Sequence, residues 1–378
     1  MSKIVGRYLD GWVREDLRKK MVLLGGPRQV GKTTFAQGLL SDYQDGHPAY
    51  MNWDDPVQRR RILNKDWPPR ERLLIFDELH KYAKWRNLLK GYYDMLKSTH
   101  QFLITGSAKL DIYRRGGDSL LGRYHYYRMH PFTLGELGFE KDALKLLLKF
   151  GGFPEPFLSQ NERDLRRWQL QRLERVVKQD LRDLEHVREI TLVERLADAL
   201  PERVGAPLSI KNLAQTLEVD FKTAQKWIEI LEALYYAYRV PPFGSPRIRA
   251  VKKEQKLYLW DWSLLVNEGF RFENLVANHL LKYCHFVQDT EGYQMELRYI
   301  RDVDKREIDF VVIRDKRPIF AVECKTGEKE ISPHIFYFLA RTKIPKFYQV
   351  HLGSAHRQPS DQVELLPFTE FCKRMSIP

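Results

Sequence analysis

Eight residues near the N-terminus have the types and spacing needed to hold a chain of phosphates. They fit the pattern G-x-x-x-x-G-K-T and lie between an apolar run and a helical stretch. With the threonine that follows, they are Gly26, Pro27, Arg28, Gln29, Val30, Gly31, Lys32, Thr33 and Thr34. Glycines let backbone N–H groups wrap phosphates without Cβ clashes, and the following helix directs its positive dipole end at the anion. We expect Lys32 to reach the β- and γ-phosphates of ATP and Thr33 to place its hydroxyl on Mg²⁺.

A second segment supplies acidic residues that suit hydrolysis. Asp77 and Glu78 end the apolar run that begins at Leu74. We expect Asp77 to hold the Mg²⁺ shell and Glu78 to orient and deprotonate the attacking water. An acidic surface turn is the alternative for this segment alone, and its pairing with the glycine-rich loop argues against that. At the end of the strand at residues 102–105, Ser107 is the candidate to position the water or sense the γ-phosphate, with Thr105 as the alternative.

Hydrolysis also needs a cation on the charge that develops on the γ-phosphate, often an arginine from a neighbouring subunit. Arg123 is the favoured candidate, and Arg114 and Arg115 are the alternatives. A surface arginine without a catalytic role remains an open interpretation for each of them.

A second constellation lies in the C-terminal third. Two apolar runs, 307–313 and 319–325, are joined by a short charged turn and predict a β-hairpin. Alternation along the second strand puts Glu323 and Lys325 on one face, and antiparallel pairing brings Asp309 close to them. Two carboxylates and a lysine can bind Mg²⁺ and activate water against a phosphodiester, although surface ion pairs are the alternative. Six basic residues could position phosphates there: Lys282, Arg298, Arg301, Lys305, Arg306 and Lys316.

The elements that carry these residues follow from the hydrophobic pattern. Up to about residue 140, buried-strand candidates alternate with helices, which predicts a parallel sheet covered on both faces. The expected strands are 20–24, 49–52, 72–76 and 101–105, and the expected helices include 7–19, 32–40 and 85–97. From 141 to about 200 the pattern is helical, interrupted by the Gly and Pro residues of 151–156.

A pair of short helices follows. The first is capped by Ser209, and after a turn at 218–221 a second covers 222–234. This spacing, with residues 235–240 after it, predicts a winged helix-turn-helix. The second helix carries Lys222, Thr223, Gln225 and Lys226, which suit phosphates or base edges, whereas a packing module is the alternative. The Pro- and Gly-rich residues 241–246 indicate a linker, and a third unit begins near residue 255.

Bulk composition narrows the partners. Lys and Arg total 63 against 50 Asp and Glu, a net charge of +13 that favours nucleic acid over an anionic membrane. The three scattered cysteines suit a reducing compartment. We find no secretory segment in the first 20 residues and no apolar run long enough to cross a membrane, so we expect a cytoplasmic protein without membrane contact.

These segments resemble the AAA-type ATPases of a large, mostly prokaryotic family. In that family a P-loop domain precedes a winged helix and a C-terminal domain of restriction-endonuclease-like fold. The resemblance covers nearly the whole chain and is carried by residues 25–34, 76–81, 104–107, 120–123, 131–137 and 151–155. It implies an ASCE-type parallel sheet, binding of ATP and Mg²⁺, and assembly into a ring.

The hairpin around Asp309 resembles the D-(x)n-E-x-K core of the PD-(D/E)xK nuclease superfamily. Glu273 matches the helical acidic residue that often precedes this core. The resemblance implies a nuclease site of Glu273, Asp309, Glu323 and Lys325, with a second Mg²⁺ or Mn²⁺ held by Asp309 and Glu323.

The expected architecture is therefore an α/β chain of four parts. They are an AAA-type ATPase domain at 1–140, a helical lid or connector at 141–205, a winged helix-turn-helix at 206–250 and a nuclease-like α/β domain at 255–378.

We expect a ring-forming homo-oligomer, a hexamer, that hydrolyses ATP to remodel or translocate duplex or branched DNA, for example by branch migration or unwinding. The main alternative is an ATP-gated switch whose nuclease-like domain binds nucleic acid or a partner without cutting. A protein-remodelling ATPase is a third reading, disfavoured because no apolar pore segment stands out.

Overall fold

The computed structural model describes residues 6–40, 46–106, 120–175, 190–244 and 254–378. The chain divides into two compact units, Met1–His130 and Pro131–Pro378. Both combine helices with β-sheet, so the predicted α/β class is confirmed.

A five-stranded parallel sheet forms the centre of the N-terminal unit. Its order is β2-β3-β4-β1-β5, so one strand separates the strand before the glycine-rich loop from the strand that ends in Asp77. The strands are β1 (Met21–Gly25), β2 (Tyr50–Asn52), β3 (Leu73–Asp77), β4 (Gln101–Thr105) and β5 (Tyr124–Arg128). β1, β3 and β4 are buried almost throughout, as expected for parallel strands covered on both faces. The four predicted strands are confirmed, and β5 was not predicted.

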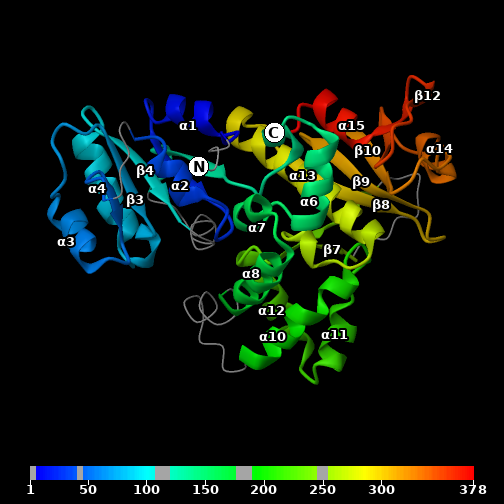
Figure 1. Cartoon of the computed structure of the whole chain (residues 1–378), viewed down its shortest axis with the longest axis horizontal. Coiled ribbons are helices and arrows are strands. Elements are labelled where there is room, and N and C mark those ends of the chain that lie inside the picture. The colour runs from blue at the N-terminus through cyan, green and yellow to red at the C-terminus, as the bar shows by residue number, and fades with distance from the viewer. Residues whose placement is uncertain (1–5, 41–45, 107–119, 176–189, 245–253) are drawn as a thin grey trace. The chain divides into compact units, whose positions relative to one another are not determined.

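Four helices of this unit are described; the first precedes β1, and each of the others connects one strand to the next, as parallel pairing requires. They are α1 (Asp10–Asp16), α2 (Lys32–Gln37), α3 (Pro56–Asn64) and α4 (Trp85–Leu96), with a short 3₁₀ turn, η1 (Leu79–Lys81). α2 packs on β3 and β4, and α3 packs on β2 (Figure 1). Because α2 begins directly after β1 and the loop, its N-terminus lies at the carboxyl edge of the sheet.

Helices open the C-terminal unit. They are α6 (Lys141–Phe150), α7 (Pro154–Ser159), α8 (Glu162–Glu174) and α10 (Ile190–Ala199), with 3₁₀ turns η2 (Leu134–Leu137) and η4 (Pro201–Arg203). The break predicted at 151–156 lies between α6 and α7. A Cβ added to Gly151 would lie 2.8 Å from Asp261 Oδ1, and its φ of +76° suits glycine. This glycine therefore allows the end of α6 to pack against the segment around Asp261.

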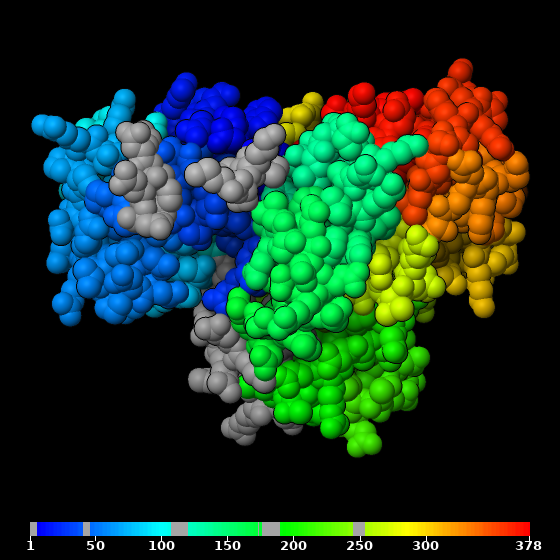
Figure 2. Space-filling model, viewed as in Figure 1, coloured from blue at the N-terminus to red at the C-terminus, as the bar shows by residue number. Residues whose placement is uncertain are grey.

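The two short helices predicted after residue 208 are present. α11 (Ile210–Thr216) is capped by the hydroxyl of Ser209, which accepts a hydrogen bond from Asn212 N–H at 3.3 Å, and α12 (Phe221–Ala233) is capped by Asp220. β6 (Ala237–Val240) then pairs antiparallel with β7 (Lys256–Leu259). In the space-filling view the green residues of this region adjoin the yellow-green residues that follow them (Figure 2).

A six-stranded mixed sheet forms the rest of this unit, in the order β12-β13-β11-β10-β9-β8. Its strands are β8 (Met295–Arg301), β9 (Glu307–Arg314), β10 (Arg317–Lys325), β11 (Phe347–His351), β12 (Arg357–Ser360) and β13 (Val363–Pro367). The accompanying helices are α13 (Glu268–Glu291), α14 (Pro333–Leu339) and α15 (Phe368–Arg374), with a 3₁₀ turn, η5 (Trp262–Leu264). α13, yellow in Figure 1, packs along β8, β9 and β10. A separate hydrophobic core, which includes Val311, Ala321 and Phe347, packs Ile335 and Phe338 of α14 against the sheet. Among the described residues, no helix has the length and apolar character needed to cross a bilayer.

Candidate nucleotide site and C-terminal carboxylate cluster

The glycine-rich loop adopts a backbone conformation that requires glycine at its first position. Gly26 has a φ of +142°, and a Cβ built there would lie 2.4 Å from the carbonyl oxygen of Met129. Gly31 is the left-handed N-cap of α2. The loop therefore curves tightly at the carboxyl end of β1 and leads its N–H groups to the start of a helix.

The amine of Lys32 lies inside this curve. Its side chain is 7% exposed, and Nζ donates to the carbonyl oxygens of Gly26 at 3.0 Å and Pro27 at 2.7 Å. Both acceptors belong to the loop itself, so the positive charge is held where the loop would surround a phosphate.

Three hydroxyl groups converge on Asp77. Thr33 Oγ1 donates to Oδ2 at 2.9 Å, Tyr50 donates to the same oxygen at 2.6 Å, and Thr105 donates to Oδ1. Parallel pairing explains the last contact, because Asp77 and Thr105 are register partners on β3 and β4. A carboxylate and a threonine hydroxyl are the hard oxygen donors that Mg²⁺ uses beside nucleotide phosphates, so Thr33 and Asp77 suit such an ion.

Tyr50 was missed by the sequence analysis. It belongs to β2, whose Asn52 is the register partner of Asp77. Burial, with the charge of Asp77, raises the pKa of the Tyr50 hydroxyl far above its usual range, so it stays a hydrogen-bond donor. A tyrosine in an apolar strand is indistinguishable in sequence from a core residue, and its position at the start of β2 gives no local signal for the site.

Glu78 is held in a left-handed backbone conformation, with a φ of +58°. Its N–H donates to Thr105 O at 3.0 Å, and its carboxylate lies 3.5 Å from the Lys81 amine. Burial, and next the charge of Asp77, raises the pKa of Glu78. A carboxylate with a raised pKa is a stronger base than an ordinary one, which suits removal of a proton from water.

The remaining sequence candidates of this unit are placed differently. Arg123 lies just before β5, at the edge of the sheet where the parallel strands begin, and it forms ion contacts with Asp94 at 2.9 and 3.2 Å. This edge of the sheet is opposite to the carboxyl edge, where the glycine-rich loop and Asp77 lie. Ser107, Arg114 and Arg115 lie outside the described residues.

In the C-terminal unit, a tight hairpin brings three predicted site residues together. Asp315 and Lys316 form its turn and have φ values of +49° and +65°, as a two-residue hairpin turn requires. On the strands, Cys324 N–H donates to Asp309 Oδ2 at 2.9 Å, and Lys325 Nζ donates to Glu323 Oε1 at 2.7 Å.

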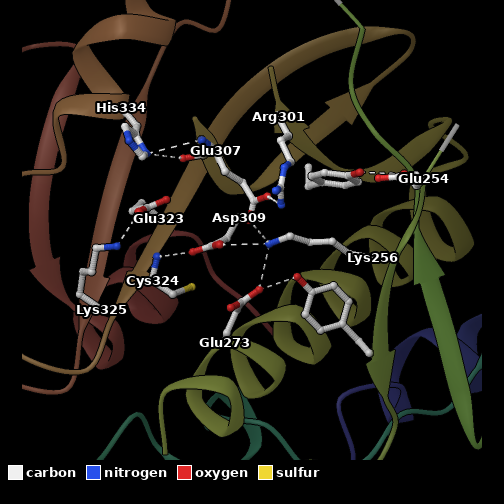
Figure 3. Close-up of polar contacts among 12 residues, drawn as sticks. Glu254, Lys256, Glu273, Arg301, Glu307, Asp309, Glu323, Cys324, Lys325 and His334 are labelled. Atoms are coloured by element: carbon white, nitrogen blue, oxygen red, sulfur yellow. Dashed lines mark hydrogen bonds and ion pairs between the residues drawn. The ribbon is translucent and has the colours of Figure 1, made fainter. Parts of the chain in front are cut away.

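The amine of Lys256 reaches this group from β7. Its Nζ lies 2.5 Å from Glu307 Oε1, 3.1 Å from Glu273 Oε1 and 3.3 Å from Asp309 Oδ1. Figure 3 shows the Lys256 amine at the centre of these three carboxylates, with Glu323 and Lys325 beyond Asp309. We call Lys256, Glu273, Glu307, Asp309, Glu323 and Lys325 the carboxylate cluster.

The carboxylate cluster contains four carboxyl groups and two lysine amines, so acidic side chains outnumber basic ones. Burial, and then the charge of Asp309, raises the pKa of Glu273 to about 7 and that of Glu323 to about 8. No group of three His, Cys, Asp or Glu side chains in the described parts of the chain is arranged to hold a metal ion. The four predicted nuclease residues are near one another, but their carboxylates do not fit a second Mg²⁺ or Mn²⁺, because lysine amines lie against all three.

Among the basic residues predicted to surround this site, Lys282 is fully buried. Its amine forms an ion pair with Glu136 and donates to Thr133 Oγ1 at 2.7 Å, so the prediction that it contacts phosphates is wrong. Arg298, Arg301 and Arg306 form ion pairs with Glu296, Glu307 and Asp302, respectively, whereas Lys305 and Lys316 are exposed.

Comparison with known families agrees with the geometry of the N-terminal unit. Residues 18–138 match the model of an AAA domain, which contains the loop, Asp77 and Glu78. The chain thus carries an AAA-type P-loop ATPase domain and is an ATPase, and nucleotide, typically with Mg²⁺, is its cofactor. Residues 141–270 and 268–371 match two domains of unknown function, DUF8612 and DUF4143.

Whole-chain relatives are distant. The chain is 24% identical over 363 residues to the uncharacterized protein Rv2008c of Mycobacterium tuberculosis, covering 93% of this chain and 80% of that one. It is 22% identical over 404 residues to the uncharacterized protein MJ1637 of Methanocaldococcus jannaschii, covering 91% and 83%.

Two solved structures are similar only in part. The Holliday junction branch migration motor RuvB of Thermotoga maritima matches with a TM-score of 0.30 and 17% identity, covering 64% of this chain and 90% of that one. The ORC1 protein of Aeropyrum pernix, in complex with DNA, matches with a TM-score of 0.33 and 12% identity, covering 74% and 95%. At such TM-scores neither structure extends the assignment beyond the AAA domain.

Proposed function

We propose that ATP hydrolysis in the N-terminal unit drives the remodelling or translocation of duplex or branched DNA, in a homo-oligomeric ring. In this proposal Lys32 contacts the terminal phosphates, Thr33 and Asp77 hold Mg²⁺, and Glu78 activates the water. Arg123 of one subunit contacts the γ-phosphate bound by the next. The ring is taken to be a hexamer.

The observation that carries the DNA assignment is the shape and charge of α11, α12 and the β6–β7 hairpin. Two capped helices joined by a short turn and followed by an antiparallel strand pair support the proposal of a winged helix-turn-helix. α12 presents Lys222 and Lys226 as exposed residues, one helical turn apart. The net charge of +13 supports the same class of partner.

The C-terminal unit supports a nuclease-like domain that binds without cutting. Glu273, Asp309, Glu323 and Lys325 lie close together on α13, β9 and β10, as the nuclease resemblance implies. Metal-dependent hydrolysis needs carboxylates that are available to a metal, and here lysine amines contact them. This observation favours recognition of DNA over cleavage by the domain.

The test compares ATP hydrolysis with no DNA, with single strands, with duplex and with a four-way junction. We expect duplex or junction DNA to stimulate hydrolysis in the native chain and Lys32→Ala to remove hydrolysis altogether. Replacing Lys222 and Lys226 by alanine should remove the stimulation and leave basal hydrolysis unchanged.

Lys145→Ala with Lys149→Ala is the matched control, because these lysines of α6 are exposed and carry the same charge. Equal loss of stimulation in both double variants would show that only net charge matters. Hydrolysis that responds to no form of DNA would reject a DNA motor and leave the ATP-gated switch.

A further inference from the structure

Lys256 is a buried charge with a complete set of partners. Its side chain is 1% exposed, and the three carboxylates around its amine come from two elements: Glu273 from α13, and Glu307 and Asp309, two residues apart, from β9. An ammonium group has three N–H donors, so each donor has one carboxylate within 2.5–3.3 Å. Burial of a charge is costly unless it is paired in this way.

The same position is the one a divalent cation would need. Mg²⁺ binds carboxylate oxygens at about 2.0–2.1 Å, and the oxygens that Glu273 and Asp309 would offer already accept hydrogen bonds from the Lys256 amine. The other oxygen of Asp309 accepts the Cys324 N–H, and Glu323 is paired with Lys325. An incoming metal ion would therefore have to displace the Lys256 ammonium group, which is covalently attached to the chain.

We propose that the Lys256 ammonium is the resident cation of the carboxylate cluster. It replaces the divalent metal of a nuclease-like site, so the acidic residues keep their arrangement without binding a metal. The placement of the cation follows from the contacts of Lys256 alone, and only its consequence for cleavage rests on the nuclease-like domain proposed above. Removal of the amine should uncover a divalent-cation site made of Glu273, Asp309 and Glu307.

A Mn²⁺ titration tests this without DNA or nucleotide, so its result is independent of the proposed motor activity. The full-length chain carries Asp77→Asn throughout, which removes the acidic residue proposed to hold metal in the N-terminal unit. Free Mn²⁺ is measured from its EPR signal. We expect no saturable binding in this parent, and one Mn²⁺ per chain after addition of Lys256→Met, which keeps a side chain of similar length.

Two controls assign the site. Adding Asp309→Asn to the Lys256→Met chain should abolish the new binding. Lys325→Met removes the other amine of the same cluster but keeps Lys256, so it should create no site.

The proposal is overturned if the Asp77→Asn parent chain binds Mn²⁺ and Asp309→Asn abolishes that binding. The Lys256 amine would then not exclude a metal ion from the cluster. It is also overturned if folded Lys256→Met binds no Mn²⁺. Should Lys256→Met be unfolded without metal, circular dichroism is measured with added Mn²⁺. Recovery of the fold, dependent on Asp309, means that the metal has taken the place of the amine, whereas no recovery rejects the proposed position.

Discussion

Substitution of Gly26 by alanine tests whether the backbone of the glycine-rich loop, and not only its side chains, holds the nucleotide. Alanine at a φ of +142° is strained, and its Cβ would approach the Met129 carbonyl oxygen to 2.4 Å. A residue in such a sparsely populated region costs about 1–3 kcal/mol. In the alanine variant without nucleotide, the loop can relax into an unstrained conformation. ATP binding then has to restore the strained conformation, and the free energy of strain is subtracted from the free energy of binding.

This free energy of strain lowers the affinity of the variant for ATP. Since 1.4 kcal/mol is a factor of ten, about 1–3 kcal/mol raises the Kd for ATP roughly 5- to 150-fold. The assay is a titration with a fluorescent ATP analogue in Mg²⁺, checked by calorimetry. Gly38→Ala is the control, because Gly38 has an ordinary φ of −66° at the end of α2 and its added Cβ would meet nothing closer than 3.4 Å.

If Gly26→Ala binds ATP as tightly as the native chain does, the backbone of the glycine-rich loop does not hold the nucleotide in the way described. The reasoning also fails if Gly38→Ala loses as much affinity as Gly26→Ala, since general loosening of the unit would then explain both. Thermal unfolding of each variant without nucleotide separates a damaged fold from a damaged loop.

Three further predictions concern single side chains. Glu78→Gln should retain ATP binding but lower kcat by about 10²–10⁴-fold, as expected for loss of a general base; loss of binding in equal measure would contradict that role. Tyr50→Phe removes a hydrogen bond to the Asp77 carboxylate that contributes about 1.5 kcal/mol, so the Mg²⁺ concentration for half-maximal hydrolysis should rise about tenfold, and an unchanged Mg²⁺ dependence would make Tyr50 a packing residue only. Burial lowers the pKa of His279 to about 3 from 6.5, so below pH 6.5 the unfolded chain takes up a proton that the folded chain does not, and the free energy of unfolding should be lower at pH 4.5 than at pH 7 by about 2.5 kcal/mol. Urea unfolding at pH 7 and 4.5 should show this loss in the native chain and not in His279→Gln.

Local patterns made much of the fold predictable. The loop, the strands of the N-terminal sheet and the hairpin at 307–325 depend on residues close in sequence, whose periodicity and turn types determine them. β5 was not predicted because Tyr124–Arg128 mixes aromatic and charged residues and has no continuous apolar run. Lys282 was misplaced because its charge suggested a surface, although its neighbours on α13 are mostly apolar and it lies on the buried face of that helix.

Lys256 shows what sequence patterns leave out. It ends a run of charged residues after a linker, which indicates exposed chain, yet its partners Glu273 and Asp309 are 17 and 53 residues further on. No local pattern reports such pairings, because they arise only when β7, α13 and β9 pack together. The predicted carboxylates were thus brought together as expected, while the cation among them could be found only in three dimensions.

The position of Lys256 also limits how the C-terminal unit can move. Its strand, β7, completes the β6–β7 hairpin that follows α12, while its amine is bound by α13 and β9 of the large sheet. Removing one partner of a buried ion pair costs about 3–5 kcal/mol, so separating this hairpin from the sheet would carry a penalty of that order. A movement within this unit that kept the amine paired would therefore carry the β6–β7 pair and the six-stranded sheet together.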